Sequence, residues 1–502
     1  MATALRRYPL IIGATLAAGI AAALLLRPHP PWRAPERGAA SASAVPAGGS
    51  PLSAQVREFE GSYPEAASPT GVVRDVALEA APATLPLLDG QPLDVWAYNV
   101  QVPGPTIRVR LGERLRVTFT NRLARPTTVH WHGVRLPNAM DGVPGVTQPA
   151  VPPGGTFVYE FVPKDAGTFW FHPHLRSSEQ VERGLYGVLV VEDPVPPPYS
   201  RDIVWVLDDW RIREGAIDPQ FNTPHDLMHD GRWGNVITVN GSIDERLTVR
   251  PGERIRLRLL NAANGRVFAP DFSGLDARVI SVDGLYTAKP LDPAGFELAP
   301  GNRIDLDITI PASAAGRQFS VVDRFTRRPN ALASIDVSQG AAVRTPAFPS
   351  PAAAHVAPWR DTEAIAPRLE YRLAARRGGE FGIEWTLNGA AARHAHDTEA
   401  STAEGDGHEV SVLPRREWSK LRFVNDSGRL HPIHLHGMFF KVLSRNGRPA
   451  DEPFFRDTVL VHGRETVDVG VVPLDEGRWM LHCHILEHAE AGMMSLLDVK
   501  SM

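Results

Sequence analysis

The chain has 502 residues, which is too long for one ordinary domain and indicates roughly two to four. Hydrophobic residues make up 43% and charged residues 22% of the sequence, as in globular domains that bury a sizeable core. The formal net charge of -4 gives no electrostatic reason to expect nucleic acid or an anionic membrane surface as a partner, and the single cysteine, Cys483, excludes an intrachain disulfide.

The N-terminal segment, residues 1–67, is expected to lie outside the fold. Arg6 and Arg7 precede an uncharged apolar run from Leu10 to Leu26, which is typical of an export signal or a single membrane anchor. Both alternatives stay open, because no small-residue cleavage site follows the run closely. Residues 27–67, rich in Ala, Pro, Ser and Gly, have the composition of a flexible tether or a discarded leader. We therefore expect an exported protein, periplasmic or otherwise extracytoplasmic.

A turn followed by strand-like residues occurs three times along the chain. The copies start near Asn99, Val239 and Leu387, and each continues into residues whose apolar side chains alternate with period two. The pattern predicts three related β-sandwich domains. Their approximate limits are 68–197, 198–343 and 362–502, and an Ala/Pro segment from Thr345 to Pro358 joins the last two.

A second element follows each copy, beginning at Gly167, Gly316 and Gly477. In the first and third copies, histidines stand five and seven residues after the glycine. The middle copy has Val321 and Asp323 there. The middle domain is therefore expected to hold no metal ligands and to space and orient the other two.

Histidines are concentrated in four short motifs. Of 18 histidines, ten belong to these motifs, and eight of the ten form His-x-His pairs. The motifs are His130-Trp-His132, His172-Pro-His174, His431-Pro-Ile-His434-Leu-His436 and His482-Cys-His484-Ile-Leu-Glu-His488, the last of which runs on to Met493. On a strand, residues i and i+2 point to the same face, so each pair offers two imidazoles to one side. We expect the four pairs to converge between the first and third domains.

Cys483 lies between two of these histidines and is expected to face the other way from them. Two imidazoles, a thiolate and a weak axial methionine are the ligands of a blue copper. Cys483, His488 and Met493 come from one loop, and His431 comes from an earlier element of the same domain. A single strand would then connect a cysteine-ligated copper to a histidine-ligated cluster, which suits rapid electron transfer.

At these motifs the sequence resembles the multicopper oxidases, the family of laccases, bacterial cuprous oxidases and ferroxidases. The resemblance includes all four motifs and, more loosely, residues 90–502. It implies an all-β fold of three tandem cupredoxin-like Greek-key β-sandwich domains, dioxygen as acceptor, and about four coppers per chain, one type 1, one type 2 and two type 3. The implied ligands are His431, Cys483, His488 and axial Met493 for type 1, His130 and His434 for type 2, and His132, His172, His174, His436, His482 and His484 for type 3.

Proton supply is the second requirement of such an enzyme. The family places an aspartate shortly after the first motif, and Asp141 in Met-Asp-Gly matches it, although Asp141 could instead stabilise the turn before Gly142. Bacterial members often carry a glutamate directly after the last type 1 histidine, where this chain has Ala489. Glu490, one residue further on, is the alternative candidate.

Several other residues have simpler interpretations. Met493 could be ordinary packing beside Met494, and Glu487 is expected to be a surface or hydrogen-bonding residue. Tryptophans expected to pack inside the sandwiches are Trp131, Trp170 and Trp479. A solvated loop or weak metal capture is expected for His225 and His229 and for the polar insertion at 391–408, with His394, His396, Asp397, Glu404, Asp406 and His408.

Two classes of function fit these observations. The first is an oxidase, and the second is an exported copper-sequestering or scaffolding protein on the same fold. The His-Cys-His bridge favours the oxidase, since a binding protein does not need it. Electrons are expected to enter through the exposed edge of His431 or His488. The few, scattered methionines favour phenolic, laccase-like donors over Cu(I) or Fe(II), and the chain is expected to be a monomer.

Overall fold

The computed structural model describes residues 69–88, 90–353, 356, 365–392 and 409–502. They belong to one compact unit that runs from Gly49 to Met502. The apolar run at Leu10–Leu26, the tether and the histidines of the 391–408 insertion lie outside the described residues. Among the residues described, no helix combines the length and the apolar character needed to cross a bilayer.

The first group of strands forms two four-stranded sheets. One has the order β2-β1-β4-β6 (Gln91–Tyr98, Val73–Leu87, Arg114–Asn121, Thr156–Phe161) and the other β3-β8-β7-β5 (Ile107–Arg110, Gly187–Glu192, Gly167–His172, His130–His132). In β4, Leu115, Val117 and Phe119 are fully buried while the residues between them are not. This period-two alternation gives the strand one face toward the core.

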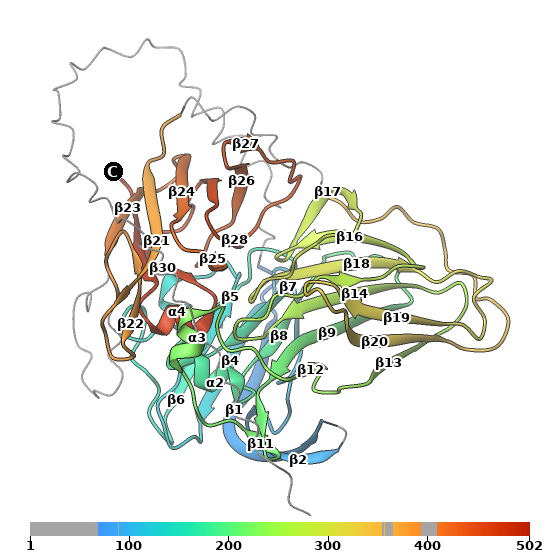
Figure 1. The fold of residues 1–502 in the computed structure, drawn as a ribbon. Helices are drawn as coiled ribbons and strands as arrows, with labels where there is room; N and C mark the ends of the chain where they lie inside the picture. The colour runs from blue at the N-terminus through green and yellow to red at the C-terminus, as the bar shows by residue number, and fades with distance from the viewer. Residues whose placement is uncertain (1–68, 89, 354–355, 357–364, 393–408) are drawn as a thin grey trace, which may run out of the picture. The chain divides into compact units, whose positions relative to one another are not determined.

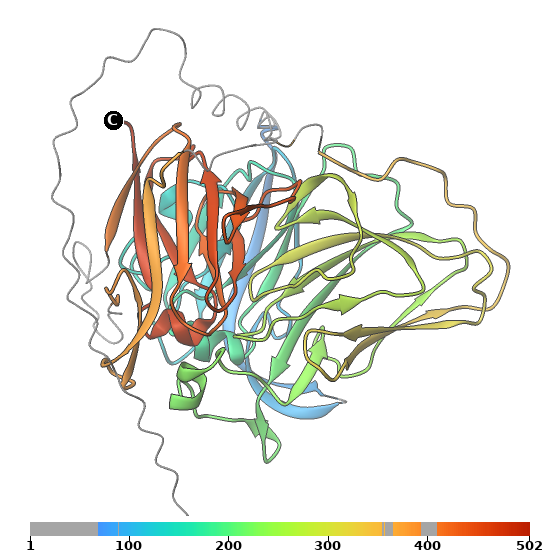
Figure 2. The ribbon, with the colours of Figure 1, turned by 45° about the horizontal axis from the view of Figure 1, so that its top comes forward.

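The second group has a six-stranded and a four-stranded sheet. The first has the order β12-β9-β14-β18-β16-β17 (Val236–Val239, Arg201–Trp210, Arg254–Asn261, Arg303–Thr309, Asp276–Val282, Leu285–Leu291). The second has the order β13-β20-β19-β15 (Glu245–Val249, Asn330–Val337, Gln318–Asp323, Pro270–Asp271). A small ribbon pairs β10 (Ile212–Arg213) with β11 (Ala216–Ile217). The strands of the two sheets, green to yellow, form a group of their own in Figures 1 and 2, whereas β11 lies beside β2.

The third group has a six-stranded and a five-stranded sheet. The first has the order β22-β21-β24-β29-β26-β27 (Ile383–Leu387, Leu369–Arg377, Ser419–Asn425, Thr466–Val471, Phe440–Arg445, Arg448–Pro449). The second has the order β23-β31-β30-β25-β28 (Val410–Pro414, Met494–Lys500, Gly477–Cys483, His431–Leu435, Thr458–Val461). With mixed parallel and antiparallel pairing in each group, the all-β prediction of three sandwich domains is confirmed.

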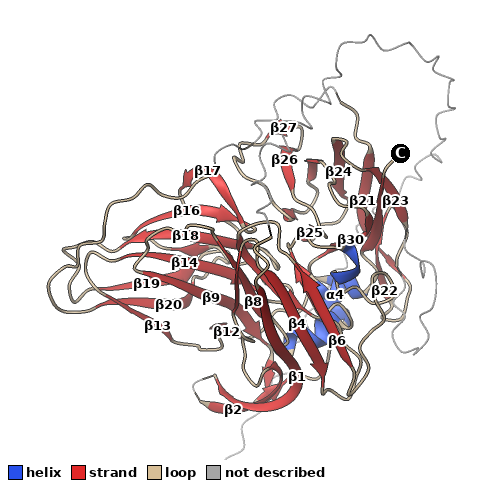
Figure 3. Cartoon of the chain, turned by 180° about the vertical axis from the view of Figure 1, so that it is seen from behind, coloured by secondary structure: helices blue, strands red, loops and turns tan. Residues whose placement is uncertain are grey.

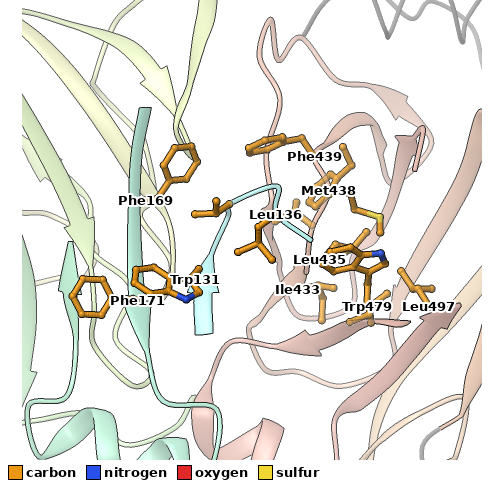
Figure 4. Packing of buried hydrophobic residues seen from close by; sticks show 14 of the residues in the cluster. Trp131, Leu136, Phe169, Phe171, Ile433, Leu435, Met438, Phe439, Trp479 and Leu497 are labelled. Atoms are coloured by element: carbon orange, nitrogen blue, oxygen red, sulfur yellow. The ribbon is translucent and has the colours of Figure 1, made fainter. Parts of the chain in front are cut away.

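The first and third groups share one hydrophobic core cluster. Figure 4 shows Trp131 and Phe171 of the first group and Ile433, Leu435 and Trp479 of the third as members of this cluster, all of them buried. Most of the second group packs in a separate cluster. The first and third groups therefore form a continuous apolar body in which facing elements can be held in fixed positions.

Short helices complete the described fold. They are the 3-10 helix η1 (Asn138–Met140) and the α-helices α2 (Ser177–Glu182), α3 (Pro224–Met228) and α4 (Leu486–Glu490). Both α2 and α3 contact α4 (Figure 1). Helix α4 also contacts β30 (Figure 3). One helix from each strand group thus lies at the end of the strand that carries Cys483.

Candidate metal centre

Strand pairing brings the histidine motifs together in register. In the first group, β5 and β7 pair so that His130 is opposite His172. In the third group, β25 and β30 pair so that His434 is opposite His482 and Ile433 is opposite Cys483. Each two-strand ribbon therefore presents histidines from both of its strands on one face.

The buried histidines form small groups whose ligand atoms lie within 4.8 Å of one another. Two groups are separate trios, His132 with His172 and His484, and His174 with His436 and His482. A third group contains His130, His132 and His434, and a fourth contains His431, Cys483 and His488. The structure thus brings together the eight histidines of the His-x-His pairs in one place and sets His431, Cys483 and His488 apart as another group.

Backbone carbonyls fix the tautomers of several of these rings. Nδ1 of His130 donates a hydrogen bond to the Asp141 carbonyl at 2.7 Å. In the same way, Nδ1 of His172 donates to the Pro173 carbonyl at 2.9 Å, and Nδ1 of His434 donates to the Asp457 carbonyl at 2.9 Å. A neutral ring that donates through Nδ1 keeps its lone pair on Nε2. These three Nε2 atoms are buried and have no hydrogen-bond partner among the described residues. Buried, unpaired and convergent lone pairs are the donor set of a metal site.

Burial keeps these imidazoles neutral. Burial is the largest cause that lowers the pKa of seven imidazoles below the ordinary value: His132, His172, His431, His434, His436, His484 and His488. Neutral imidazole is the form that binds a metal ion. The donors are therefore ready at neutral pH without first losing a proton.

The cysteine group has the convergent geometry of a second site. Sγ of Cys483 lies 3.6 Å from Nδ1 of His431 and 3.8 Å from Nδ1 of His488, and the two Nδ1 atoms are 3.3 Å apart. Burial lowers the pKa of His488 to about 3 and raises the pKa of the Cys483 thiol. Metal binding at this group would therefore displace a proton from sulfur. Met493 is fully buried, and its carbonyl accepts a hydrogen bond from the Cys483 amide at 3.1 Å.

The expectation of an exposed histidine edge at this group is wrong. Both His431 and His488 have 0% exposure. Nε2 of His488 donates to the carbonyl of His229 at 2.8 Å, and Nε2 of His431 lies 3.0 Å from the Ser427 hydroxyl. The ring of Trp385 packs on both imidazoles, with centroid distances of 4.2 Å to His488 and 4.8 Å to His431. A donor must therefore deliver its electron through this cover.

Asp141 contacts two of the clustered histidines. Its carbonyl accepts from His130, and its Oδ2 accepts from Nδ1 of His436 at 2.8 Å. The other carboxylate oxygen, Oδ1, is buried without a hydrogen-bond partner among the described residues and lies 3.3 Å from Nδ1 of His130. Gly142 has a φ of +81°, and a side chain there would collide with the Val129 carbonyl, so the turn that places Asp141 needs glycine.

Asp457 is a residue that sequence reasoning missed. Its Oδ1 lies 3.2 Å from Nε2 of His132, and its carbonyl accepts from His434. Arg303 of the second group donates to both carboxylate oxygens, at 3.0 and 2.7 Å, and all of these side chains are fully buried. Burial alone would raise the pKa of Asp457, but the charge of Arg303 and the hydrogen bonds from His434 and Arg303 together outweigh burial and hold that pKa below the ordinary value. No local motif marks Asp457, because Arg303 and His132 are 154 and 325 residues away in the sequence.

The two glutamates beside the last motif are both held by hydrogen bonds. Glu487 is buried and accepts from the Arg232 amide at 3.0 Å and from Asn264 at 2.8 Å, so it is a hydrogen-bonding residue and not a surface one. Glu490 accepts from the Ser178 amide at 2.7 Å and from Asn222 at 2.6 Å. It lines a cavity of about 390 Å³, and burial raises its pKa to about 7. Its predicted part in proton supply stays a prediction.

The remaining candidates have clear locations. The three tryptophans predicted to pack, Trp131, Trp170 and Trp479, are fully buried, which confirms that prediction. In the middle copy, Val321 packs in the core, and Asp323 accepts hydrogen bonds from the amides of Ala269 and Phe325. His225 is exposed and stacks on His229 with a centroid distance of 4.3 Å.

Known proteins match this chain over most of its length. Three family models described as multicopper oxidase match residues 79–196, 202–342 and 383–502. The multicopper oxidase MmcO of Mycobacterium tuberculosis is 32% identical, with 86% of this chain and 89% of the relative covered. Laccase-1 of Botryotinia fuckeliana is 27% identical, with 84% and 80% covered. The crystal structure of a multi-copper oxidase from Pseudomonas thermotolerans superposes with a TM-score of 0.73 at 33% identity, over 86% of this chain and all of the other.

Proposed function

The chain belongs to the multicopper oxidase family of copper-dependent oxidoreductases that use dioxygen, and from this premise we propose that it couples one-electron oxidation of a reducing donor to the four-electron reduction of dioxygen to water. The main support for this proposal is the arrangement of three consecutive residues, 482 to 484. His482, Cys483 and His484 each belong to a different group of converging ligand atoms. A protein that only stored copper would not need one strand to join three sites.

The side chains fit copper. Imidazole suits copper, and thiolate suits its reduced form. We assign His431, Cys483, His488 and Met493 as the residues that would hold a type 1 copper, and His130 and His434 as those that would hold a type 2 copper. The type 3 pair would take the two histidine trios: His132, His172 and His484, and His174, His436 and His482. Copper, when bound, would accept single electrons at the cysteine site and supply them to dioxygen at the histidine cluster, with about four ions per chain.

The protein's own groups orient the donor atoms. Carbonyls at Asp141, Pro173 and Asp457 hold ring Nδ1 protons and so direct Nε2 lone pairs inward. We propose that Asp141 also transfers protons to reduced oxygen. Its carboxylate oxygen Oδ1 is buried in the cluster and has no hydrogen-bond partner among the described residues. Glu490 is proposed as a further proton donor, reached from the cavity that it lines.

The domain limits proposed are 68–197, 198–343 and 362–502, with catalytic ligands in the first and last. The middle domain would hold no catalytic copper, since Val321 and Asp323 occupy the two positions that are histidines in its sisters. We further propose an exported monomer whose residues 1–67 act as signal or anchor plus tether. Donors would be phenolic compounds of the laccase type, and metal ions are a second candidate because the covered imidazoles favour small donors.

Oxygen uptake tests the proposal. Copper-loaded protein supplied with a phenol or a reducing dye should consume one dioxygen per four electrons and release no hydrogen peroxide. Copper analysis should give about four ions per chain. Peroxide as the main product, or tight copper binding without oxygen uptake, would refute the four-electron reaction.

A further inference from the structure

One imidazole of the histidine cluster lacks the kind of hydrogen bond that orients several of the other rings. Nδ1 of His482 donates to the carbonyl of Cys483 at 2.8 Å, and Nδ1 of His436 donates to Oδ2 of Asp141 at 2.8 Å. In His484, by contrast, both ring nitrogens are buried, and neither has a hydrogen-bond partner on another described residue. A metal ion can occupy only one of them. The orientation of the His484 ring must therefore come from packing.

Trp170 supplies part of that packing. It is opposite His132 in the pairing of β5 with β7, and because it stands two residues before His172 it points to the same face of the sheet. The centroid of its ring lies 5.4 Å from that of His484, 5.1 Å from that of His132 and 4.2 Å from that of His172. These three imidazoles form one of the two trios. Trp170 thus lies against every ring of a single trio.

Trp170 is itself supported by the second strand group. Its side chain is fully buried and belongs to a hydrophobic cluster with Val206, Leu260 and Ala262. Its indole nitrogen has no hydrogen-bond partner among the described residues. The ring therefore acts on the imidazoles through shape and dispersion contacts, and a tightly packed cluster behind it keeps it in place.

Gly301 of the second group approaches two rings of the same trio. Its φ is +89°, and a Cβ atom at this position would lie 2.9 Å from Cε1 of His132 and 3.1 Å from Cδ2 of His484. The amide of Gly301 donates to the carbonyl of Asn261 at 3.0 Å, and its carbonyl accepts from Arg303 at 3.0 Å. The glycine is thus fixed where a side chain would press on both rings.

We propose that Trp170 is a positioning residue that orients the His484 imidazole in place of the hydrogen bond that this ring lacks, and that Gly301 leaves the space that the ring needs. This assignment rests on the proposed copper centre, for which His484 would be a ligand. His484 directly follows Cys483, so the orientation of its ring determines how one trio is connected to the cysteine group. A residue outside the ligand set thus controls metal affinity at that trio.

The Trp170→Phe variant tests the role of the indole. Phenylalanine keeps an apolar ring but has a smaller area, so the imidazoles of the trio lose part of their support. Loss of a residue that orients a ligand should lower copper affinity at this trio by about 10–100-fold. A competing chelator should then remove about one ion per chain more readily than from the parent protein, while the blue colour remains.

Trp131→Phe is the matched control. Trp131 lies on β5 among the cluster histidines, but its ring packs on Tyr159, Phe161 and Phe171 in the core (Figure 4). The substitution removes the same atoms from an equally buried side chain, so the free energy of unfolding should fall similarly. Equal loss of copper in the two variants would overturn the proposal, because general loosening of the core would then explain the result.

Gly301→Ala is a second, independent test, with Gly295→Ala as its control. Both glycines have a left-handed φ, +89° and +81°, but a Cβ atom at Gly295 would have no other atom within 4 Å. Alanine should therefore cause similar backbone strain at both positions and displace the ring of His484 only from Gly301. Equal copper retention in the two variants would overturn the proposed role of Gly301.

A measurement without copper separates this proposal from the oxidase function. In the metal-free protein labelled with ¹³C-histidine, the ring signals of His484 should shift or broaden in Trp170→Phe and stay unchanged in Trp131→Phe. An unchanged His484 signal in Trp170→Phe would overturn the positioning role even if the enzyme is active. Absence of oxygen uptake by the parent protein would instead overturn the oxidase, and the histidine spectra would still decide the role of Trp170.

Discussion

Arg303 on β18 and Asp457, just before β28, form a buried ion pair with contacts of 3.0 and 2.7 Å, although they belong to different strand groups. Asp457 in turn contacts His132 and His434. Gly133 leaves the space for this pair, because a side chain there would collide with both partners. The second group, which contributes no histidine to the clusters described, thus supports the cluster through a guanidinium.

Replacing this guanidinium should weaken copper binding as well as the fold. Arg303→Met leaves the Asp457 carboxylate buried and unpaired, which should cost about 3–5 kcal/mol of the free energy of unfolding. Because Asp457 would then shift or take up a proton, its hold on His132 and His434 should loosen. We expect lower copper content after dialysis against a chelator and an altered type 2 signal in electron paramagnetic resonance.

Arg266→Met is the matched control for this variant. Arg266 also belongs to the second group and pairs with buried Asp209 at 2.7 Å, but neither residue contacts the histidine groups. It should cost a similar free energy of unfolding and leave the copper content intact. Equal copper loss in the two variants would mean that Arg303 acts only through overall stability.

Much of the fold follows from local patterns. The period-two alternation around Leu115, Val117 and Phe119 predicts a strand, and the His-x-His spacing predicts which side chains share a face. Three copies of one pattern predict three sandwiches. What the sequence does not specify is the pairing of distant strands, such as β25 with β30, which depends on packing between segments far apart in the chain.

The surroundings of the site are less predictable for the same reason. Asp457 and Arg303 are 154 residues apart, and neither lies in a recognisable motif. The cover over His488 comes from α3, a five-residue helix of the second strand group whose docking depends on the Arg211–Asp226 pair and on buried Leu227. An exposed histidine edge was the natural expectation, because nothing in the local sequence of His488 shows that His229 lies against it.

Cys483→Ser should remove the blue colour and stop the entry of electrons from the donor. Serine lacks the soft sulfur that the proposed type 1 copper requires, whereas the histidine trios contain no atom of Cys483. Copper analysis should therefore show loss of about one ion per chain, with the remainder retained. Full dye oxidation by this variant would contradict the assignment of Cys483.

Asp141→Asn should slow dioxygen reduction selectively. The asparagine oxygen can still accept from Nδ1 of His436, so the ring should stay in place, but the carboxylate that hands over protons is gone. We expect turnover to fall by roughly 10²-fold or more. Bleaching of the blue colour by a donor under nitrogen should keep its rate. Asp323→Asn, a buried aspartate of the second group, is the control. Slower anaerobic bleaching with normal reoxidation would contradict the role.

The buried imidazoles of the metal-free protein should stay neutral well below pH 6.5. Burial lowers the pKa of His488 to about 3, whereas the hydrogen bond to Glu297, at 2.9 Å, raises the pKa of His462. With ¹³C-labelled histidine, nuclear magnetic resonance should show His462 titrating above pH 6.5 and His488 unchanged from pH 8 to 5. Between pH 6.5 and 3 the unfolded chain binds a proton at His488 that the folded chain does not. The free energy of unfolding therefore falls by about 1.4 kcal/mol per pH unit as the pH falls through that window, and His488 does not change it above pH 6.5. A His488 midpoint near 6.5 would contradict both its burial and its readiness to bind copper.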